Sequence, residues 1–92
     1  MTLTSEVSSM VQEVIRTLGE QNETLATAES ITAGGLSSAI TSVEGSSQIF
    51  LGAIVAYQDQ IKAKILGIDE TLIATHTVYS QEVAVAMAQA AR

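Results

Sequence analysis

The sequence lacks cysteine and proline, and it has few aromatic and few basic residues. Without cysteine the chain has neither disulfide bonds nor thiolate metal sites, which fits a reducing compartment. The 92 residues include four Lys and Arg against ten Asp and Glu, which gives a net charge of −6. Because so acidic a chain lacks the basic surface that polyanions require, we expect no nucleic-acid partner and no membrane partner.

Long hydrophobic runs are also absent. The longest run, IFLGAIVAY over residues 49–57, has the length of a strand, whereas a membrane-spanning helix needs roughly 20 apolar residues. The first ten residues show no basic stretch followed by an apolar one, so no secretory signal is visible. Together with the missing cysteine, these features lead us to expect a cytoplasmic protein.

Helices and strands are predicted to alternate along the chain. Apolar residues at helical spacing, with polar caps and closing glycines, predict four helices and a further helical turn or two: 5–18 (ending at Gly19), 32–43, 59–66 (with Asp59 as cap), 69–75 and 81–92. Strands are predicted over 24–28 and 49–57, with a turn over 44–47 between the second helix and the second strand. Gly52 indicates a bulge or a close neighbour in the second strand. This order predicts the α/β class.

Two strands make only a marginal sheet, and residues 49–57 are too apolar for an exposed edge. We therefore expect one domain over residues 1–92 that is incomplete and has few strands. Two readings follow: the chain is part of a larger domain, or it completes its sheet with another copy of itself as a homo-oligomer.

The segment TAESITAGG contains the first candidate site. Ser30 follows the first predicted strand, at the carboxyl edge of the sheet, where open α/β folds bind ligands. We expect the N–H groups of residues 32–35 to open the next helix, where they can stabilise an oxyanion or bind phosphate. Gly34 and Gly35 would let a ligand approach closely. The simpler alternative is that Ser30 or Thr32 caps a helix and the glycines form a packing notch.

Tyr57 and Lys62 end the second strand and begin the next helix. If the two strands are parallel neighbours, Ser30, Tyr57 and Lys62 converge at one edge. A lysine near a helix N-terminus is disfavoured as an ammonium ion, and a neutral amine can take the proton of a serine nucleophile. Alternatively, Lys62 is a solvated helix charge and Tyr57 is a core residue.

Other polar residues carry weaker signals. Glu29 either positions Lys62 or caps a neighbouring helix, and the lone His76 is typical of a surface or capping residue. No cluster of side chains has metal-ligand spacing, so we expect no structural metal, and nothing in the sequence calls for a cofactor.

The sequence resembles the C-terminal domain of the competence-damage-inducible protein CinA family. The resemblance rests on TLATAESITAGGL, VEGSSQIFLGAIVAYQDQIKAKILGI and LIATHTVYSQEVAVAMAQAAR, in the family's order and spacing. It implies a three-layer α/β/α fold and hydrolysis of the amide of nicotinamide mononucleotide, giving nicotinic acid mononucleotide and ammonia. Ser30 is then expected to be the nucleophile, Lys62 its base and Tyr57 the third catalytic residue. Glu29 and the loop over Thr32, Ala33, Gly34 and Gly35 are expected to bind the nucleotide.

The sequence departs from the family at several positions. Ile31 replaces a common cysteine, Ala33 a common glycine, and TVYS (77–80) the commoner GAVS, which adds Tyr79. The family domain also continues past the equivalent of Arg92. The resemblance therefore leaves two alternatives to an amidohydrolase: a non-catalytic family member that acts as an oligomerisation module, or one that binds nucleotide at residues 32–35 without hydrolysis.

Overall fold

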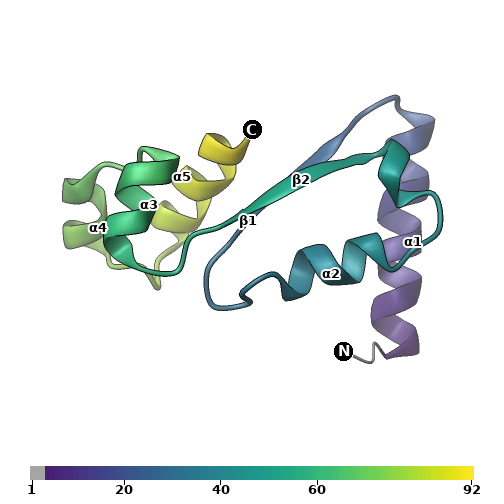
Figure 1. Ribbon diagram of the computed structural model, residues 1–92, viewed down its shortest axis with the longest axis horizontal. Helices are drawn as coiled ribbons and strands as arrows, with labels where there is room; N and C mark the ends of the chain where they lie inside the picture. The colour runs from purple at the N-terminus through teal and green to yellow at the C-terminus, as the bar shows by residue number, and fades with distance from the viewer. Residues whose placement is uncertain (1–3) are drawn as a thin grey trace.

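The computed structural model describes residues 4–92, which form five α-helices, one short 3₁₀ helix and two strands (Figure 1). In chain order they are α1 (Ser5–Glu20), β1 (Leu25–Glu29), α2 (Gly35–Thr41), the 3₁₀ helix η1 (Ser46–Gln48), β2 (Phe50–Val55), α3 (Asp59–Leu66), α4 (Glu70–His76) and α5 (Gln81–Ala91). The element order matches the prediction from sequence.

The two strands form a parallel sheet. Leu25 lies opposite Phe50, and Glu29 lies opposite Val55 at the carboxyl end. The register shifts after Leu25, and Gly52, which has a φ of 156°, faces Ala26 just beyond this shift. The bulge expected at Gly52 is therefore confirmed.

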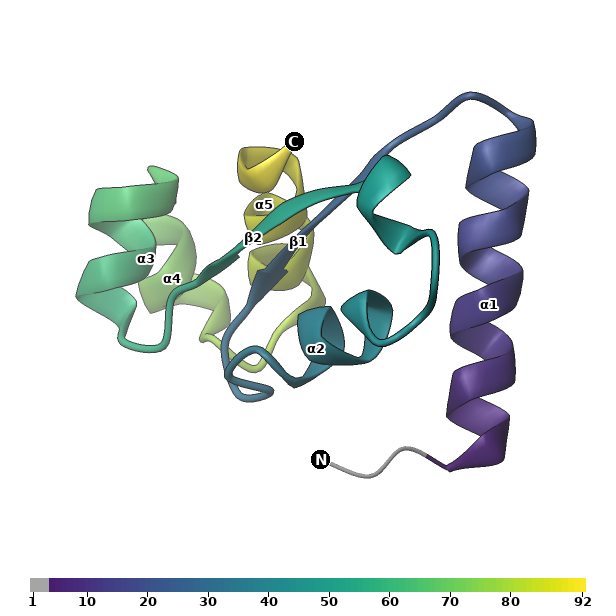
Figure 2. The same ribbon diagram turned by 45° about the vertical axis from the view of Figure 1, so that its right-hand side comes forward.

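Helices cover both faces of the sheet, as Figures 1 and 2 show. On one face α3, α4 and α5 enclose a core that Ala28 and Ile54 contact from the strands: Ala56, Leu66, Ile68, Ile73, Val83 and Met87. On the other face α1 and α2 pack around Ile15, Ile40 and Ile49, with Leu25 and Phe50 from the strands. The α/β class and the three layers are confirmed.

Polar caps and one glycine fix most helix boundaries. The side chains of Thr4, Asp69 and Ser80 each accept a hydrogen bond from the first turn of α1, α4 and α5. Gly67 ends α3 with a φ of 69°. Gly19, in contrast, does not end α1, which continues to Glu20.

The main difference from prediction is the start of α2, at Gly35 and not at residue 32. Two tight turns occupy residues 30–35, because Ala33 N–H donates to the Ser30 carbonyl (3.1 Å) and Gly35 N–H to the Thr32 carbonyl (2.8 Å). Ala33 and Gly34 have φ angles of 49° and 98°, outside the helical region. Smaller differences are that Asp59 is the first residue of α3, after the cap Gln58, and that η1 extends the 44–47 turn.

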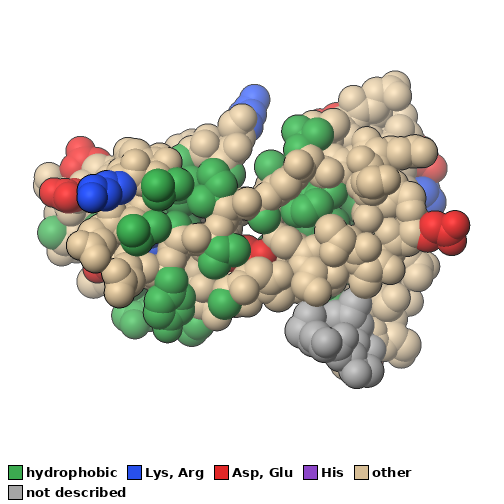
Figure 3. All heavy atoms as spheres, viewed as in Figure 1, with side chains coloured by type: hydrophobic (Ala, Val, Ile, Leu, Met, Phe, Trp, Pro, Cys, Tyr) green, Lys and Arg blue, Asp and Glu red, His purple; other side chains and the backbone are tan. Residues whose placement is uncertain are grey.

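The molecule is more open than a compact domain of its length. Its radius of gyration is 14.3 Å, against roughly 12 Å expected for 92 residues. Several large apolar side chains are exposed, including Leu51 on β2 (72%) and Met10 on α1 (68%), and Figure 3 shows groups of hydrophobic side chains in the left-hand half and near the centre of one face. Within residues 4–92 no helix has the length and hydrophobicity needed to cross a membrane.

Val83 and Val85 on α5 test where the core lies. Val83 is fully buried, whereas Val85 is 45% exposed. Val83→Ala should lower the free energy of unfolding by about 2 kcal/mol, because it removes buried methyl groups and leaves a cavity. Val85→Ala, the matched control on the same helix, should change it by less than about 1 kcal/mol. Urea denaturation followed by circular dichroism measures both, and equal losses would contradict this core.

Candidate active site at the carboxyl edge of the sheet

Ser30 lies directly after β1, at the edge where both strands end. Glu29 is paired with Val55, and the N–H of Ala56 donates to the Glu29 carbonyl at 2.9 Å. This register places Ser30 beside the Ala56–Tyr57 segment of the neighbouring strand, whose backbone is roughly 4.8 Å away in a parallel pair. The parallel arrangement on which the predicted convergence depended is therefore present.

Glu29 connects the end of β1 to the start of α2. Its side chain is 2% exposed, and its two oxygens accept hydrogen bonds from the N–H groups of Leu36 (2.8 Å) and Ser37 (2.9 Å). The Ser37 hydroxyl also donates to Glu29 at 2.5 Å and lies 2.7 Å from the Thr27 hydroxyl. Of the two roles predicted for Glu29, the structure thus supports the helix cap; no contact with Lys62 is present among the described hydrogen bonds and ion pairs.

The surroundings of Glu29 hold it as a carboxylate. Burial by itself raises its pKa, but hydrogen bonds from the side chains of Ser37 and Thr32 and from the backbone of Ser37 and Leu36 outweigh burial and lower the pKa to about 2. The first turn of α2 therefore binds a negatively charged group of the protein itself, the Glu29 carboxylate. The prediction that the N–H groups of residues 32–35 open this helix is wrong, because the turns use two of them and Glu29 binds those of residues 36 and 37.

Three backbone N–H groups of the Ser30 loop remain available. Those of Ile31, Thr32 and Gly34 donate to no acceptor within residues 4–92. Gly34 has a left-handed φ of 98°, and a Cβ added there would lie 4.0 Å from the Val55 side chain. Such amides, next to a serine hydroxyl, are suitable donors to an oxyanion.

Lys62 projects from α3 into the interior. Its side chain is 2% exposed, and its Nζ donates to the Tyr57 carbonyl at 2.8 Å. The Asp59 carboxylate, one helical turn earlier, lies 3.8 Å from Nζ. Lys62 is therefore not the solvated helix charge of the simpler alternative, and its amine is fixed at the end of β2.

Tyr57 contacts Lys62 through its backbone. Its carbonyl accepts the amine hydrogen bond, while its side chain is 66% exposed. The described contact of Tyr57 with the Lys62 amine therefore comes from the backbone carbonyl and not from the phenol. The structure thus brings Ser30, Tyr57 and Lys62 to one edge of the sheet, and their catalytic roles stay predictions.

Sequence reasoning missed Ser37, Thr27 and the Asp59–Lys62 contact. Ser37 and Thr27 are ten residues apart, and Ser37 and Glu29 are eight apart, on different elements. No local pattern marks such contacts. His76, as predicted, ends a helix near the surface, with Nδ1 3.4 Å from Glu82. Residues 4–92 contain no group of three or more His, Asp or Glu placed to bind a metal.

Comparison with known sequences places the chain in a protein family. The family model for the CinA C-terminal domain matches residues 7–92. The chain belongs to this family. A CinA-like protein of Synechococcus sp. strain RCC307 is 43% identical over 84 residues, which are 91% of this chain and 20% of the relative. One from Prochlorococcus marinus strain NATL2A is 45% identical over 76 residues, 83% of this chain and 18% of the relative.

Solved CinA-family structures share the fold. The competence/damage inducible protein CihA of Agrobacterium tumefaciens superposes with a TM-score of 0.91 at 27% identity, over 99% of this chain and 56% of that protein. A CinA superfamily protein of Escherichia coli gives a TM-score of 0.90 at 28% identity, over 99% of this chain and 54% of that one. The chain thus spans about half the length of these structures and about a fifth of its curated relatives.

The Glu29 carboxylate makes folding of this CinA-family chain depend on pH. Its pKa falls from 4.5 to about 2 on folding, so ionised Glu29 contributes about 3 kcal/mol above pH 4.5, which is lost as the pH falls toward 2. Glu29→Gln should remove this contribution from the pH dependence of the free energy of unfolding between those limits. Glu23→Gln, at an exposed position, is the control. Urea denaturation at several pH values measures both, and identical pH profiles of wild type and Glu29→Gln would contradict the assignment.

Proposed function

We propose that this chain carries the nucleophile and the base of an amidohydrolase that deamidates nicotinamide mononucleotide. The observation that carries the proposal is the buried Lys62 amine, held by the Tyr57 carbonyl at the same sheet edge as Ser30. A serine and a fixed amine at one edge form the pairing of Ser–Lys hydrolases. Membership of the CinA C-terminal domain family supports the assignment.

The reaction proceeds in two halves. The Lys62 amine accepts the Ser30 hydroxyl proton as the oxygen bonds to the carboxamide carbon, and the free N–H groups of Ile31, Thr32 and Gly34 donate to the resulting oxyanion. The carbon–nitrogen bond then breaks, and the Lys62 ammonium returns the proton so that ammonia leaves. Water, activated by the same amine, hydrolyses the ester to nicotinic acid mononucleotide.

The remaining predicted residues have supporting roles in this proposal. Glu29 acts indirectly, since its oxygens hold α2 and the turns that precede it. Thr32, Ala33, Gly34 and Gly35 form the backbone surface that the nucleotide approaches. The substrate phosphate binds elsewhere, because the Glu29 carboxylate already occupies the first turn of α2 and repels an anion there. This repulsion also disfavours a non-hydrolytic nucleotide module built on residues 32–35.

Ser30→Ala and Lys62→Met test the chemistry. Each should lower the rate of ammonia release from nicotinamide mononucleotide by about a thousandfold or more, because a nucleophile and its base act as a unit. Ser38→Ala, at an exposed serine on α2, is the matched control and should leave the rate unchanged. Product formation is followed by mass spectrometry, and circular dichroism confirms folding. A Ser30→Ala protein that deamidates at the wild-type rate would refute the proposal.

A second candidate function, association of two copies, is favoured by the apolar groove between α1, β1 and α2. This hollow of about 350 Å³ is apolar apart from Thr27: it is lined by Val7, Met10, Val11, Val14, Ile15, Leu25, Thr27, Leu36 and Ile40. Met10 and Leu36 at its rim are 68% and 48% exposed. Apolar surface of this kind is typical of protein–protein contacts. Burying it against a second copy would produce the homo-oligomer expected from the sequence.

Met10→Lys tests the second candidate. A buried ammonium group in the apolar groove opposes association, so we expect a wild-type dimer and a monomeric variant in size-exclusion chromatography with light scattering. Gln12→Lys, on an exposed position of the same helix, should remain dimeric. A wild-type chain that is monomeric at high micromolar concentration would exclude this function.

A further inference from the structure

Two buried hydroxyl groups are connected to the Glu29 carboxylate. Ser37 on α2 and Thr27 on β1 are 9% and 8% exposed, and their hydroxyl oxygens lie 2.7 Å apart. The Ser37 hydroxyl donates to Glu29 Oε2 at 2.5 Å. Because an ionised carboxylate can only accept hydrogen bonds, the single hydroxyl proton of Ser37 is used by Glu29, and the Ser37 oxygen accepts from Thr27. The three side chains thus form one directed series of hydrogen bonds.

The Ser37 hydroxyl fixes the Glu29 side chain more firmly than backbone donors alone would. Each carboxylate oxygen has one backbone donor, the N–H of Leu36 for Oε1 (2.8 Å) and the N–H of Ser37 for Oε2 (2.9 Å). The hydroxyl adds a second and shorter bond to Oε2. Burial raises the pKa of Glu29, and among the hydrogen bonds that lower it to about 2 the Ser37 hydroxyl contributes most. Removing this hydroxyl therefore takes away the strongest side-chain restraint on Glu29.

The Ser30 loop, residues 30–35, depends on the positions of its two ends. Within the loop, the described backbone hydrogen bonds are those of its two turns, and the Ile31 side chain is 80% exposed, so packing restrains it little. Ala33 has a left-handed φ of 49°, which is unfavourable for a residue with a Cβ. Glu29 precedes the loop, and α2, which Glu29 binds, follows it. A carboxylate that moves relative to α2 therefore lets the loop relax.

We propose that Ser37 is a positioning residue: its hydroxyl, oriented by Thr27, fixes the Glu29 carboxylate and thereby keeps the Ser30 loop in the conformation that places its free N–H groups next to the serine. Because Ser37 is buried, it acts through Glu29 and not through contact with a substrate. Its effect on catalysis rests on the proposed function, whereas its effect on the loop does not.

Hydrogen exchange of backbone amides tests this inference without turnover. The N–H groups of Ala33 and Gly35 form the two turn hydrogen bonds of the loop. In Ser37→Ala, NMR should detect exchange of both about tenfold faster than in the wild type, because a hydrogen bond to a charged group is among the stronger ones. The Ser42 N–H, which donates to the Ser38 carbonyl (3.1 Å) at the other end of α2, should keep its rate.

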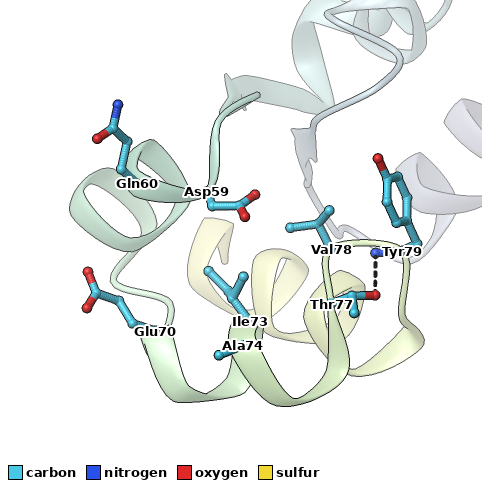
Figure 4. Close-up of a pocket in the computed structure, with 8 residues that line it drawn as sticks. All are labelled: Asp59, Gln60, Glu70, Ile73, Ala74, Thr77, Val78 and Tyr79. Atoms are coloured by element: carbon cyan, nitrogen blue, oxygen red, sulfur yellow. Dashed lines mark hydrogen bonds between the residues drawn. The ribbon is translucent and has the colours of Figure 1, made fainter.

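Matched variants separate the hydroxyl from the fold. Ser37→Thr retains the hydroxyl and should restore the exchange rates of the wild type, whereas Thr27→Val removes the donor to Ser37 and should accelerate loop exchange less than Ser37→Ala does. Thr77→Val is the control. Figure 4 shows Thr77 in the loop before α5, where its hydroxyl accepts from the Tyr79 N–H (3.3 Å). Its removal should leave exchange in the Ser30 loop unchanged.

Two further measurements connect the hydroxyl to Glu29 and to the reaction. In Ser37→Ala, NMR titration of the Glu29 side chain should give a pKa raised from about 2 toward 4.5. The kcat for ammonia release from nicotinamide mononucleotide should fall about tenfold while KM stays within about twofold, because misplaced reacting groups slow the chemical step and Ser37 does not bind the substrate.

The outcome is separable from that of the proposed function. Equal acceleration of the Ser42 amide and the loop amides would mean that Ser37 only stabilises α2, and unchanged loop exchange in Thr27→Val and Ser37→Ala would equally overturn the inference. Thr27→Val alone decides if Ser37→Ala does not fold. If the loop loosens selectively but the wild type releases no ammonia, the inference holds and the amidohydrolase proposal fails. If the wild type releases ammonia and Ser37→Ala matches its exchange and kcat, only the amidohydrolase proposal holds.

Discussion

The Glu29 carboxylate in the first turn of α2 is the interaction on which the site depends. It is buried at the end of β1, and the N–H groups of Leu36 and Ser37 and the Ser37 hydroxyl all donate to it. A buried carboxylate is costly unless its hydrogen bonds are satisfied, and this one is satisfied by the helix that it caps. The strand end and the helix start are thereby held together, and the Ser30 loop, which connects them, has its two ends fixed.

The charged groups of the site lie on different segments: the Glu29 carboxylate is at the start of α2, and the Lys62 amine is beside the end of β2. The Glu29 carboxylate occupies the first N–H groups of α2, so this helix N-terminus does not attract a phosphate, as it does in many open α/β proteins. The Lys62 amine lies beside the end of the other strand, where it donates to the Tyr57 carbonyl. The loop between them contributes neutral N–H groups, which stabilise a developing oxyanion more readily than they retain a charged ligand.

The features of the fold and the site that depend on interactions between residues close in sequence could be predicted from the sequence. Helical spacing, capping residues and the apolar run to Tyr57 predicted the element order. The convergence of Ser30, Tyr57 and Lys62 at one edge was predicted only for the case that the two strands are parallel neighbours, as they are. The start of α2 was misplaced because Ala33 in a left-handed conformation has no sequence signature, unlike a glycine. The Glu29–Ser37–Thr27 contacts join residues on separate elements, and which hydroxyl meets which carboxylate depends on the packing of α2 against the sheet.

Burial is concentrated where the chemistry is proposed. The least exposed side chains in the described part of the chain are Ala56 and Val83 at 0%, and Glu29 and Lys62 at 2%. Ala56 also supplies the N–H that joins β2 to the Glu29 carbonyl. Leu51, near the opposite end of the strands, is 72% exposed. Because tight packing limits side-chain rotation, the Glu29 carboxylate and the Lys62 amine are held in place at the carboxyl edge, whereas Ile31 in the Ser30 loop and Tyr57 are 80% and 66% exposed.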